Sequence, residues 1–381
     1  MTDVETAVTV PKVITTSSTE LLTKEPININ SNAATNGRVN VINVLNLVGF
    51  FLSLSISYVG GVAGWFGGNT NIEVYNKYIT LITPSNFYYG KFSAMMHYFL
   101  FFQNHVVNNR ITSFHCLVIE YIWGTIFLFE GFFAITQLLP TYRHHPLVQE
   151  SIGPYFFLTC MSQCIWQILL GYELLFAASL AVIGLFLSLL TLMIRQYNTI
   201  NDEEKRRIVL INTGETTVVD YSARSPSLAY WLLRFPFALH AGWVTTSVPV
   251  VVAMAVVQLG WKTEYELWIS CVSLPLIFGC CLGLLLREEL GLPSYVFSIA
   301  CAYNFAGIAW ALFAPSNLLL DRHDDASITL MKNLSGFCAI CILVVMISRC
   351  AVLIMRDQCK KLRKKDEVEV IDGIEYPYMK A

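Results

Sequence analysis

Charged residues are scarce in this chain. Only 14% of its 381 residues are Asp, Glu, Lys or Arg, whereas a soluble domain has about 25%. In their place are apolar stretches with at most one charge, each near the roughly 20 helical residues that cross a bilayer. They lie at residues 42–66, 122–140, 155–171, 174–194, 235–261, 267–286, 290–313 and 334–355. The sequence therefore predicts an all-α polytopic membrane bundle of about eight transmembrane helices.

Motifs for catalysis and metal binding are missing as well. The sequence has no phosphate-binding glycine loop, no H-E-x-x-H zinc motif and no G-x-S-x-G nucleophile elbow. Most of the eleven cysteines lie in or beside apolar segments, where a free thiol behaves as a small hydrophobic side chain. We therefore predict that the protein is not an enzyme and has no metal site, and no motif identifies a cofactor.

The two ends of the chain also lack membrane character. Residues 1–40 are polar and carry no signal-peptide pattern, so we expect a disordered N-terminal tail. The bundle is expected to occupy residues 41–355, and residues 356–381 to form a basic tail.

Basic residues concentrate in that tail and in the loop at residues 195–234. Four predicted spans separate the two segments, so they lie on one side, which the positive-inside rule makes cytoplasmic. Eight spans put the N-terminus on this side too, whereas a single long span over residues 155–194 would put it on the other. Within the loop, β-branched runs on either side of Thr213-Gly214 predict a small hairpin.

One predicted span carries a carboxylate near its middle, Glu130. On a helix it shares a face with Trp123, Phe127, Ala134 and Gln137, at spacings of three and four. A charge at the centre of a span costs about 3 kcal/mol, so such a residue normally faces the bundle interior. We expect Glu130 to be either protonated and hydrogen-bonded or paired with a cation.

A matching face occurs in the span at residues 235–261. It is formed by Pro236, His240, Trp243 and Ser247, and Asn304 lies within another span, residues 290–313. Together these polar and aromatic residues can line an apolar cavity with a few polar anchors, the usual form of a small-molecule site. The alternative is that they are interhelical hydrogen bonds, each adding about 0.6 kcal/mol.

Three stretches carry a family resemblance. The sequence IWGTIF at residues 122–127 resembles the V-W-G-T-L-Y stretch of the translocator protein and tryptophan-rich sensory protein family (TspO/MBR). The sequence FALHAGW at residues 237–243 resembles that family's L-A-L-N-x-x-W, with His240 at the Asn position. The sequence LPSYVFSIACAYN at residues 292–304 is similar to the family's Pro-Tyr-leading helix, one residue short. The three occur in the family's order.

The first of these matches is interrupted. In the family a Pro lies eight positions before the Trp of the hexamer, whereas Pro84 precedes Trp123 by 39. Removing the 31 residues 91–121 restores the spacing of eight. We therefore expect 91–121 to be an insertion into a family motif, for which a retained intron or a mistaken gene model would account.

The resemblance implies a five-helix TspO-like core within an enlarged branch of the family. Members bind porphyrins, haem-related tetrapyrroles, sterols and synthetic aromatic ligands among their helices. The resemblance therefore implies that this chain binds a hydrophobic small molecule, such as a tetrapyrrole or a sterol, as a receptor or carrier. The motifs place Trp123, His240 and Trp243 near the ligand, and the shared helix faces add Phe127, Glu130 and Asn304.

Two other functions stay open. Glu130 could serve a proton-coupled secondary transporter, because acids inside a membrane commonly relay protons. The chain could also be a scaffold that recruits partners through its basic tail. The expected partners are the lipid bilayer and the ligand, with no nucleic acid, and the Gly279/Gly283 pair suits a homodimer contact.

Overall fold

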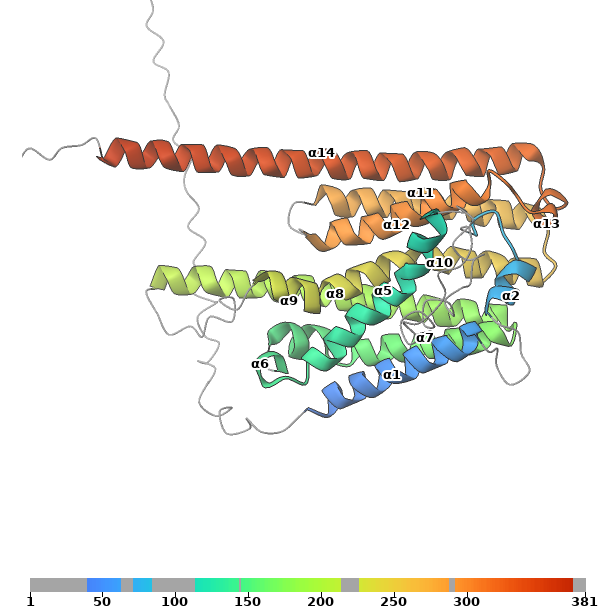
Figure 1. Ribbon diagram of the computed structural model, residues 1–381, viewed down its shortest axis with the longest axis horizontal. Helices are drawn as coiled ribbons and strands as arrows, with labels where there is room; N and C mark the ends of the chain where they lie inside the picture. Colours follow the sequence, from blue (N-terminus) through green and yellow to red (C-terminus); the bar gives the residue numbers. More distant parts are fainter. Residues whose placement is uncertain are drawn as a thin grey trace, which may run out of the picture. The chain divides into compact units, whose positions relative to one another are not determined.

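The computed structural model describes residues 40–62, 71–83, 114–143, 145–213, 226–287 and 292–372, and all regular structure within them is helical (Figure 1). This confirms the predicted all-α class. The helices are α1 (Val41–Val62), α2 (Asn71–Lys77), α5 (Phe114–Thr136), α6 (Pro140–Arg143), η3 (Leu147–Ile152), α7 (Tyr155–Gly171), α8 (Leu175–Thr213), α9 (Pro226–Leu233), α10 (Phe235–Gln258), α11 (Thr263–Leu286), α12 (Leu292–Ala311), α13 (Asn317–Leu320) and α14 (Asp325–Asp372).

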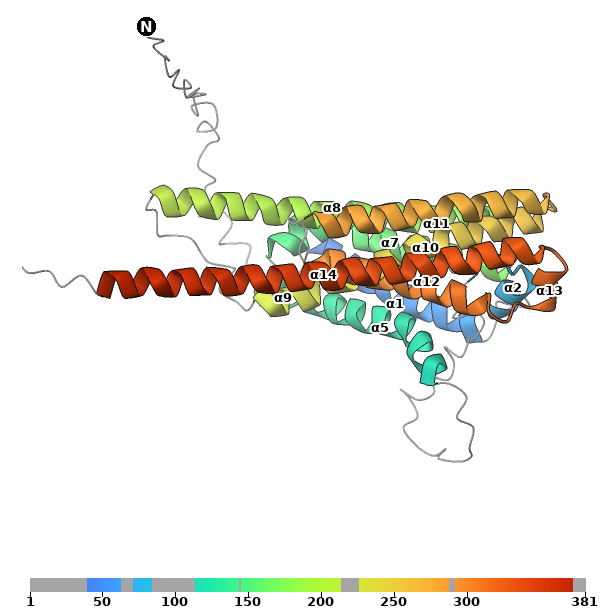
Figure 2. The same cartoon turned by 90° about the horizontal axis from the view of Figure 1, so that it is seen from above.

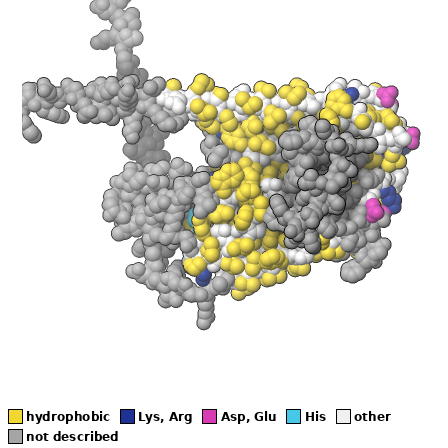
Figure 3. Space-filling view, viewed as in Figure 1, with side chains coloured by type: hydrophobic (Ala, Val, Ile, Leu, Met, Phe, Trp, Pro, Cys, Tyr) yellow, Lys and Arg dark blue, Asp and Glu magenta, His cyan; other side chains and the backbone are white. Residues whose placement is uncertain are grey.

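A helix lies at each of the eight predicted spans. Among the described helices, α1, α8, α10, α11 and α14 contain segments long and apolar enough to cross a membrane, and α5, α7 and α12 contribute shorter apolar segments. Hydrophobic side chains cover much of the described surface in Figure 3, and charged side chains gather mainly near the end that carries α2 and α13. The protein is therefore an integral, multi-pass membrane protein.

Helix α10 lies at the centre of the bundle. Its apolar segment is 72% buried, the largest share among the five candidate spans, because α5, α8, α11 and α12 all pack against it. The contact with α12 is very close at Gly242, where an added Cβ atom would lie 2.5 Å from the carbonyl oxygen of Phe297 and 2.8 Å from the Cβ atom of Ala300. Glycine is therefore required for this approach.

Helices α7 and α8 form an antiparallel pair joined by a tight turn. Glu173 in this turn adopts a left-handed conformation with φ of 57°, and its carbonyl oxygen accepts a hydrogen bond from the side-chain amide of Gln258 on α10. The alternative in which residues 155–194 form one long span is thus wrong. Residues 155–194 belong to two helices and not to one, because the chain reverses its direction at residues 172–174.

The basic loop begins as a continuation of α8. The predicted hairpin is wrong for its first run, because α8 stays helical through Thr213. The sequence NDEEKRR at residues 201–207 is rich in good helix formers, which extend the helix into the β-branched residues that follow. Residues 214–225, the second run of that hairpin, lie outside the described residues.

Both α8 and α14 extend beyond the other helices at the same end of the bundle (Figures 1 and 2). Residues 1–39 of the predicted tail, residues 91–113 of the predicted insertion and residues 373–381 lie outside the described residues. The remaining part of that insertion, residues 114–121, forms the first two turns of α5.

Candidate functional site

A carboxylate and an imidazole meet inside the bundle. The Oε1 atom of Glu130 on α5 lies 2.6 Å from the Nδ1 atom of His240 on α10. The two side chains are only 2% and 0% exposed. A buried ionisable group is costly unless it is paired and hydrogen-bonded, and each of these residues supplies the other's partner. The structure thus brings together the two polar residues that the sequence placed on separate helix faces.

Trp123 lies at the centre of an aromatic cluster beside this pair. Its ring centroid is 5.9 Å from that of Phe127, 6.1 Å from that of Trp166, 5.7 Å from that of His240 and 6.1 Å from that of Trp243. The Phe127 ring is stacked on Trp123, and the rings of His240 and Trp243 meet it edge-on. We call these five residues the aromatic cluster. It contains four of the six predicted ligand-binding residues, and Glu130 is bonded to it.

Trp166 on α7 is the member that is not among the six predicted ligand-binding residues. It belongs to a helix that lies outside the stretches resembling the family, so no motif pointed to it. The available signal was its position between Gln163 and Gln167 in an otherwise apolar helix, where two amides flank an indole. Such polar groups inside a span usually face other helices and not lipid.

Two buried polar atoms border Trp123 and lack a hydrogen-bond partner among the described residues. They are the Nε2 atom of His240 and the indole nitrogen of Trp166. A buried polar atom left unsatisfied costs about 1–3 kcal/mol, so in native proteins such an atom calls for a specific explanation. A bound molecule that hydrogen-bonds or coordinates them would provide one.

Asn304 and Gln137 are bonded elsewhere. The Asn304 amide on α12 donates to the carbonyl oxygen of Ala300 in its own helix, at 3.1 Å. Its place in a ligand site stays a prediction. The Gln137 side chain accepts a hydrogen bond from Asn46 at 3.0 Å, and its carbonyl oxygen accepts one from Asn43 at 3.1 Å. Gln137 therefore joins α5 to α1, as expected for an interhelical hydrogen bond.

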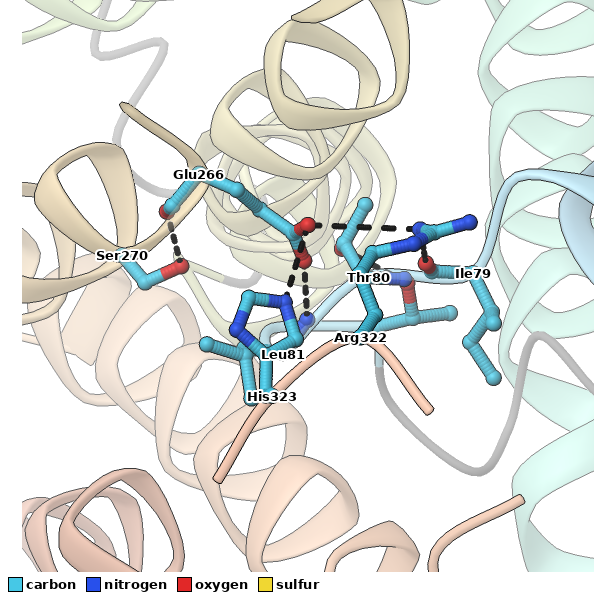
Figure 4. A network of polar contacts seen from close by, with 8 residues as sticks. Ile79, Thr80, Leu81, Glu266, Ser270, Arg322 and His323 are labelled. Carbon is cyan, nitrogen blue, oxygen red and sulfur yellow. Dashed lines mark hydrogen bonds and ion pairs between the residues drawn. The ribbon is translucent and has the colours of Figure 1, made fainter. Parts of the chain in front are cut away.

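A second buried carboxylate, Glu266 in the first turn of α11, holds a loop in place (Figure 4). Its Oε1 atom accepts a hydrogen bond from the backbone N–H of Leu81 at 2.9 Å. Its Oε2 atom lies 3.0 Å from the Nε2 atom of His323 and 4.0 Å from Nη1 of Arg322. Arg322 in turn donates to the carbonyl oxygen of Ile79 at 3.0 Å.

The loop held by Glu266 is unusual because residues 79–83 are all buried. A buried loop must have its backbone polar groups satisfied, and here side chains of α11 and of the turn before α14 satisfy two of them. Sequence reasoning missed this network, because an acid in the first turn of a helix is explained by the helix dipole alone. The adjacent Arg322 and His323 were the available signal.

The helix before this loop is anchored as well. The Nζ atom of Lys77 lies 2.6 Å from Oε2 of Glu173, and the Tyr78 hydroxyl donates to the same oxygen at 2.8 Å. The hydrogen bond to Glu173 raises the pKa of Lys77 above its usual value. Helix α2 and residues 79–83 are thus fastened to the α7–α8 turn at one end and to α11 at the other.

Metal ligands do not gather in the part of the chain that the structure describes, where no three His, Cys, Asp or Glu side chains form a metal-binding group. The comparisons with known proteins give one match. Residues 117–348 match the family described as TSPO-like protein, a stretch of 232 of the 381 residues. This stretch contains both Glu130 and His240 and excludes α1. No curated protein and no solved structure matches the chain.

Proposed function

Because the chain belongs to the TSPO-like protein family, we propose that it binds a flat hydrophobic molecule, a tetrapyrrole or a sterol, inside the helix bundle as a receptor or carrier. The observation that carries the proposal is the aromatic cluster assembled around the Glu130–His240 pair. Three helices contribute to it: α5, α7 and α10.

The cluster has the chemistry that a flat apolar ligand needs. Large ring systems gain free energy by stacking on indoles, and aromatic pairs add about 0.5–1.5 kcal/mol beyond the burial of their area. The Nε2 atom of His240 and the indole N–H of Trp166 offer hydrogen bonds to a polar edge of the ligand. Trp123 is only partly buried, so it is the ring of the cluster that an entering molecule reaches most easily.

Protoporphyrin titration of the purified full chain tests the proposal through tryptophan fluorescence. We expect saturable quenching that becomes weaker in a variant with both Trp123→Phe and Trp243→Phe. The matched control replaces Trp268 and Trp310, whose side chains are 68% and 61% exposed on the outside of the bundle. Quenching that the cluster variant leaves unchanged would place the site elsewhere.

A proton-coupled secondary transporter is the second candidate. The distance of 2.6 Å between Oε1 of Glu130 and Nδ1 of His240 favours it, because acids inside a membrane commonly relay protons and the adjacent imidazole is a partner for such a transfer. Uptake into liposomes driven by a proton gradient should fail in a Glu130→Gln variant. Uptake at the full rate in that variant would remove the reason for this candidate.

The orientation is also part of the proposal. The basic extensions of α8 and α14 lie at one end of the bundle, which the positive-inside rule makes cytoplasmic. The start of α1 lies at this end too, because Asn46 donates to the carbonyl oxygen of Gly153 and Arg195 donates to that of Glu150. The N-terminus is then cytoplasmic as well.

A further inference from the structure

A second group of buried polar atoms lies where α11 ends and α12 begins, beside α14. We propose that this place binds the phosphate group of an anionic phospholipid, with Arg349, Tyr295 and Arg287 as the binding residues. The inference goes beyond the proposed function, because it concerns other helices than the aromatic cluster and a different class of ligand.

Arg349 lies on the face of α14 that packs against its neighbours. Ile342, Val345 and Met346 precede it at spacings of seven, four and three, and all three belong to the hydrophobic core or pack against it. An apolar residue would continue this face. A charged side chain inside a span is costly and usually marks a specific role, so the guanidinium at this position needs an explanation.

Only part of the guanidinium is used within the protein. Its Nη2 atom donates a hydrogen bond to the backbone carbonyl oxygen of Arg287, directly after α11, at 2.6 Å. This bond caps the C-terminus of α11. The Nη1 atom of Arg349 is also buried, yet it has no hydrogen-bond partner in the part of the chain that the structure describes. Capping α11 therefore explains one amino group and leaves the other without a role.

Tyr295 adds a second donor at the same place. Its ring centroid is 5.7 Å from the guanidinium carbon of Arg349, and the residue is only 8% exposed. Its hydroxyl interacts weakly with the thiol of Cys350 and has no other hydrogen-bond partner among the described residues. Tyr295 is the fourth residue of α12, and the first backbone N–H groups of a helix attract anions.

The surroundings favour a lipid phosphate over a free one. The group lies at the end of three apolar helices, on the side that the orientation proposed above makes cytoplasmic. Leu286 on α11 and Ile347 on α14 are exposed on either side of it, so acyl chains can lie against them while the head group meets the arginines. Basic pockets between helices on the cytoplasmic side are a common form of site for anionic head groups.

General attraction between charges does not account for such a site. Glu288 and Glu289 follow Arg287 in the chain, and both lie outside the described residues. Because the turn carries these two acids, selectivity for an anion must come from the donors of Arg349 and Tyr295 and not from an excess of positive charge.

Arg195 on α8 provides an internal comparison at the same end of the bundle. It also donates to a backbone carbonyl oxygen, that of Glu150, and its guanidinium carbon is 5.1 Å from the ring centroid of Tyr155. Arg195 is exposed, however, so water can satisfy its remaining donors. The two arginines share their contacts and differ in the buried donors that only the Arg349 group has.

The test titrates the purified full chain in detergent with phosphatidic acid and counts the bound lipid by native mass spectrometry. We expect saturable binding that is tighter than that of phosphatidylcholine. Tyr295→Phe should weaken the binding of phosphatidic acid by about tenfold, because a hydrogen bond to a charged group is lost while no charge is removed. Tyr155→Phe is the matched control and should leave the binding within about threefold.

Tyr295→Phe is chosen because Arg349 also holds the end of α11, so its replacement would mix folding with binding. Without lipid, Tyr295→Phe should unfold at a temperature no lower than the unaltered protein, because it removes a buried hydroxyl that is poorly bonded. Arg287→Gln, which alters an exposed side chain and keeps the backbone carbonyl, should also weaken the binding by about tenfold.

Three results would overturn the inference. Equal binding of phosphatidic acid and phosphatidylcholine would show unselective lipid contact only. Equal effects of Tyr295→Phe and Tyr155→Phe would show that general attraction governs the binding. Displacement of the lipid by excess inorganic phosphate would show a site for a free anion, whereas a lipid site should retain its ligand.

Discussion

Glu130 and His240 are ionisable side chains, and burying either one alone in a helix bundle without water would be costly. Their contact at 2.6 Å gives each a partner, while their burial removes the water that would otherwise solvate them. Removing one member of such a pair leaves the other buried without a partner. Replacing both residues with apolar ones of similar size often leaves the stability unchanged. This asymmetry separates a structural contribution from a functional one.

We therefore predict opposite results for single and double substitutions. Glu130→Leu should lower the free energy of unfolding by about 3–5 kcal/mol, because His240 would be buried alone. Adding His240→Leu should recover most of the loss in stability but not ligand binding. Thermal unfolding in detergent and porphyrin titration would measure the two effects. A double variant as unstable as the single one would show that the pair does not act as a unit.

The sequence could indicate both members of this pair, because helical spacing is local and puts each on a polar and aromatic face. That the two faces meet was an expectation based on their matching residues, because helical spacing alone does not determine how α5 and α10 pack. Trp166 has the amides of Gln163 and Gln167 beside it, but only the packing of α7 on α5 brings it to Trp123.

At the scale of helices, the approach of α10 to α12 depends on a single missing side chain. Gly242→Ala should lower the free energy of unfolding by about 1–3 kcal/mol, because the new methyl group would overlap Phe297 and Ala300 and force the helices apart. Thermal unfolding in detergent would measure it.

Gly279→Ala on α11 is the matched control. It has nothing within 4 Å of an added Cβ atom and should gain up to about 1 kcal/mol from helix propensity. Equal effects at the two positions would contradict the close packing of α10 on α12.

The buried loop at residues 79–83 is predicted to depend on Glu266. Glu266→Gln should speed deuterium exchange in this loop, because the backbone N–H of Leu81 loses a charged acceptor, and hydrogen bonds to charged groups contribute about 1.5–3 kcal/mol. Exchange monitored by mass spectrometry would show it. Glu264→Gln is the control, since Glu264 is exposed in the same turn of α11. Equal exchange in both variants would mean that the loop is held by other contacts.

At this scale the sequence located the long helices well and their ends poorly. Hydrophobic stretches predict spans because lipid solvation acts on each segment separately. The last residues of α8, up to Thr213, include a β-branched run that favours a strand. They are helical because the helix propagates into them from the charged residues before them. The turn between α7 and α8 has no Gly or Pro within residues 172–174 to mark it.

Across the whole molecule, the orientation in the membrane is testable with single cysteines. The starting variant lacks the exposed Cys280, Cys350 and Cys359. In this variant Glu150→Cys should react with a membrane-impermeant maleimide only when the reagent is given access to the cytoplasmic side of the membrane. Lys262→Cys should react from the opposite side, because Lys262 lies between α10 and α11, three predicted crossings after Glu150. Both native residues are exposed.

The reverse labelling pattern would contradict the positive-inside assignment. Labelling of both cysteines from one side would contradict the predicted crossings themselves. Charge alone could not have placed the N-terminus, since the answer depended on whether residues 155–194 form one helix or two.

The hydrogen bond between Arg322 and Ile79 joins residues separated by 243 positions. Because a ribosome delivers the chain from its N-terminus, the early segment must wait for the turn that precedes α14 before its contacts at this end of the protein are complete. Until Arg322 is made, the backbone carbonyl of Ile79 lacks its native donor. A nascent chain truncated before Arg322 should thus be recognised by membrane quality control, even though most of its helices are already inserted.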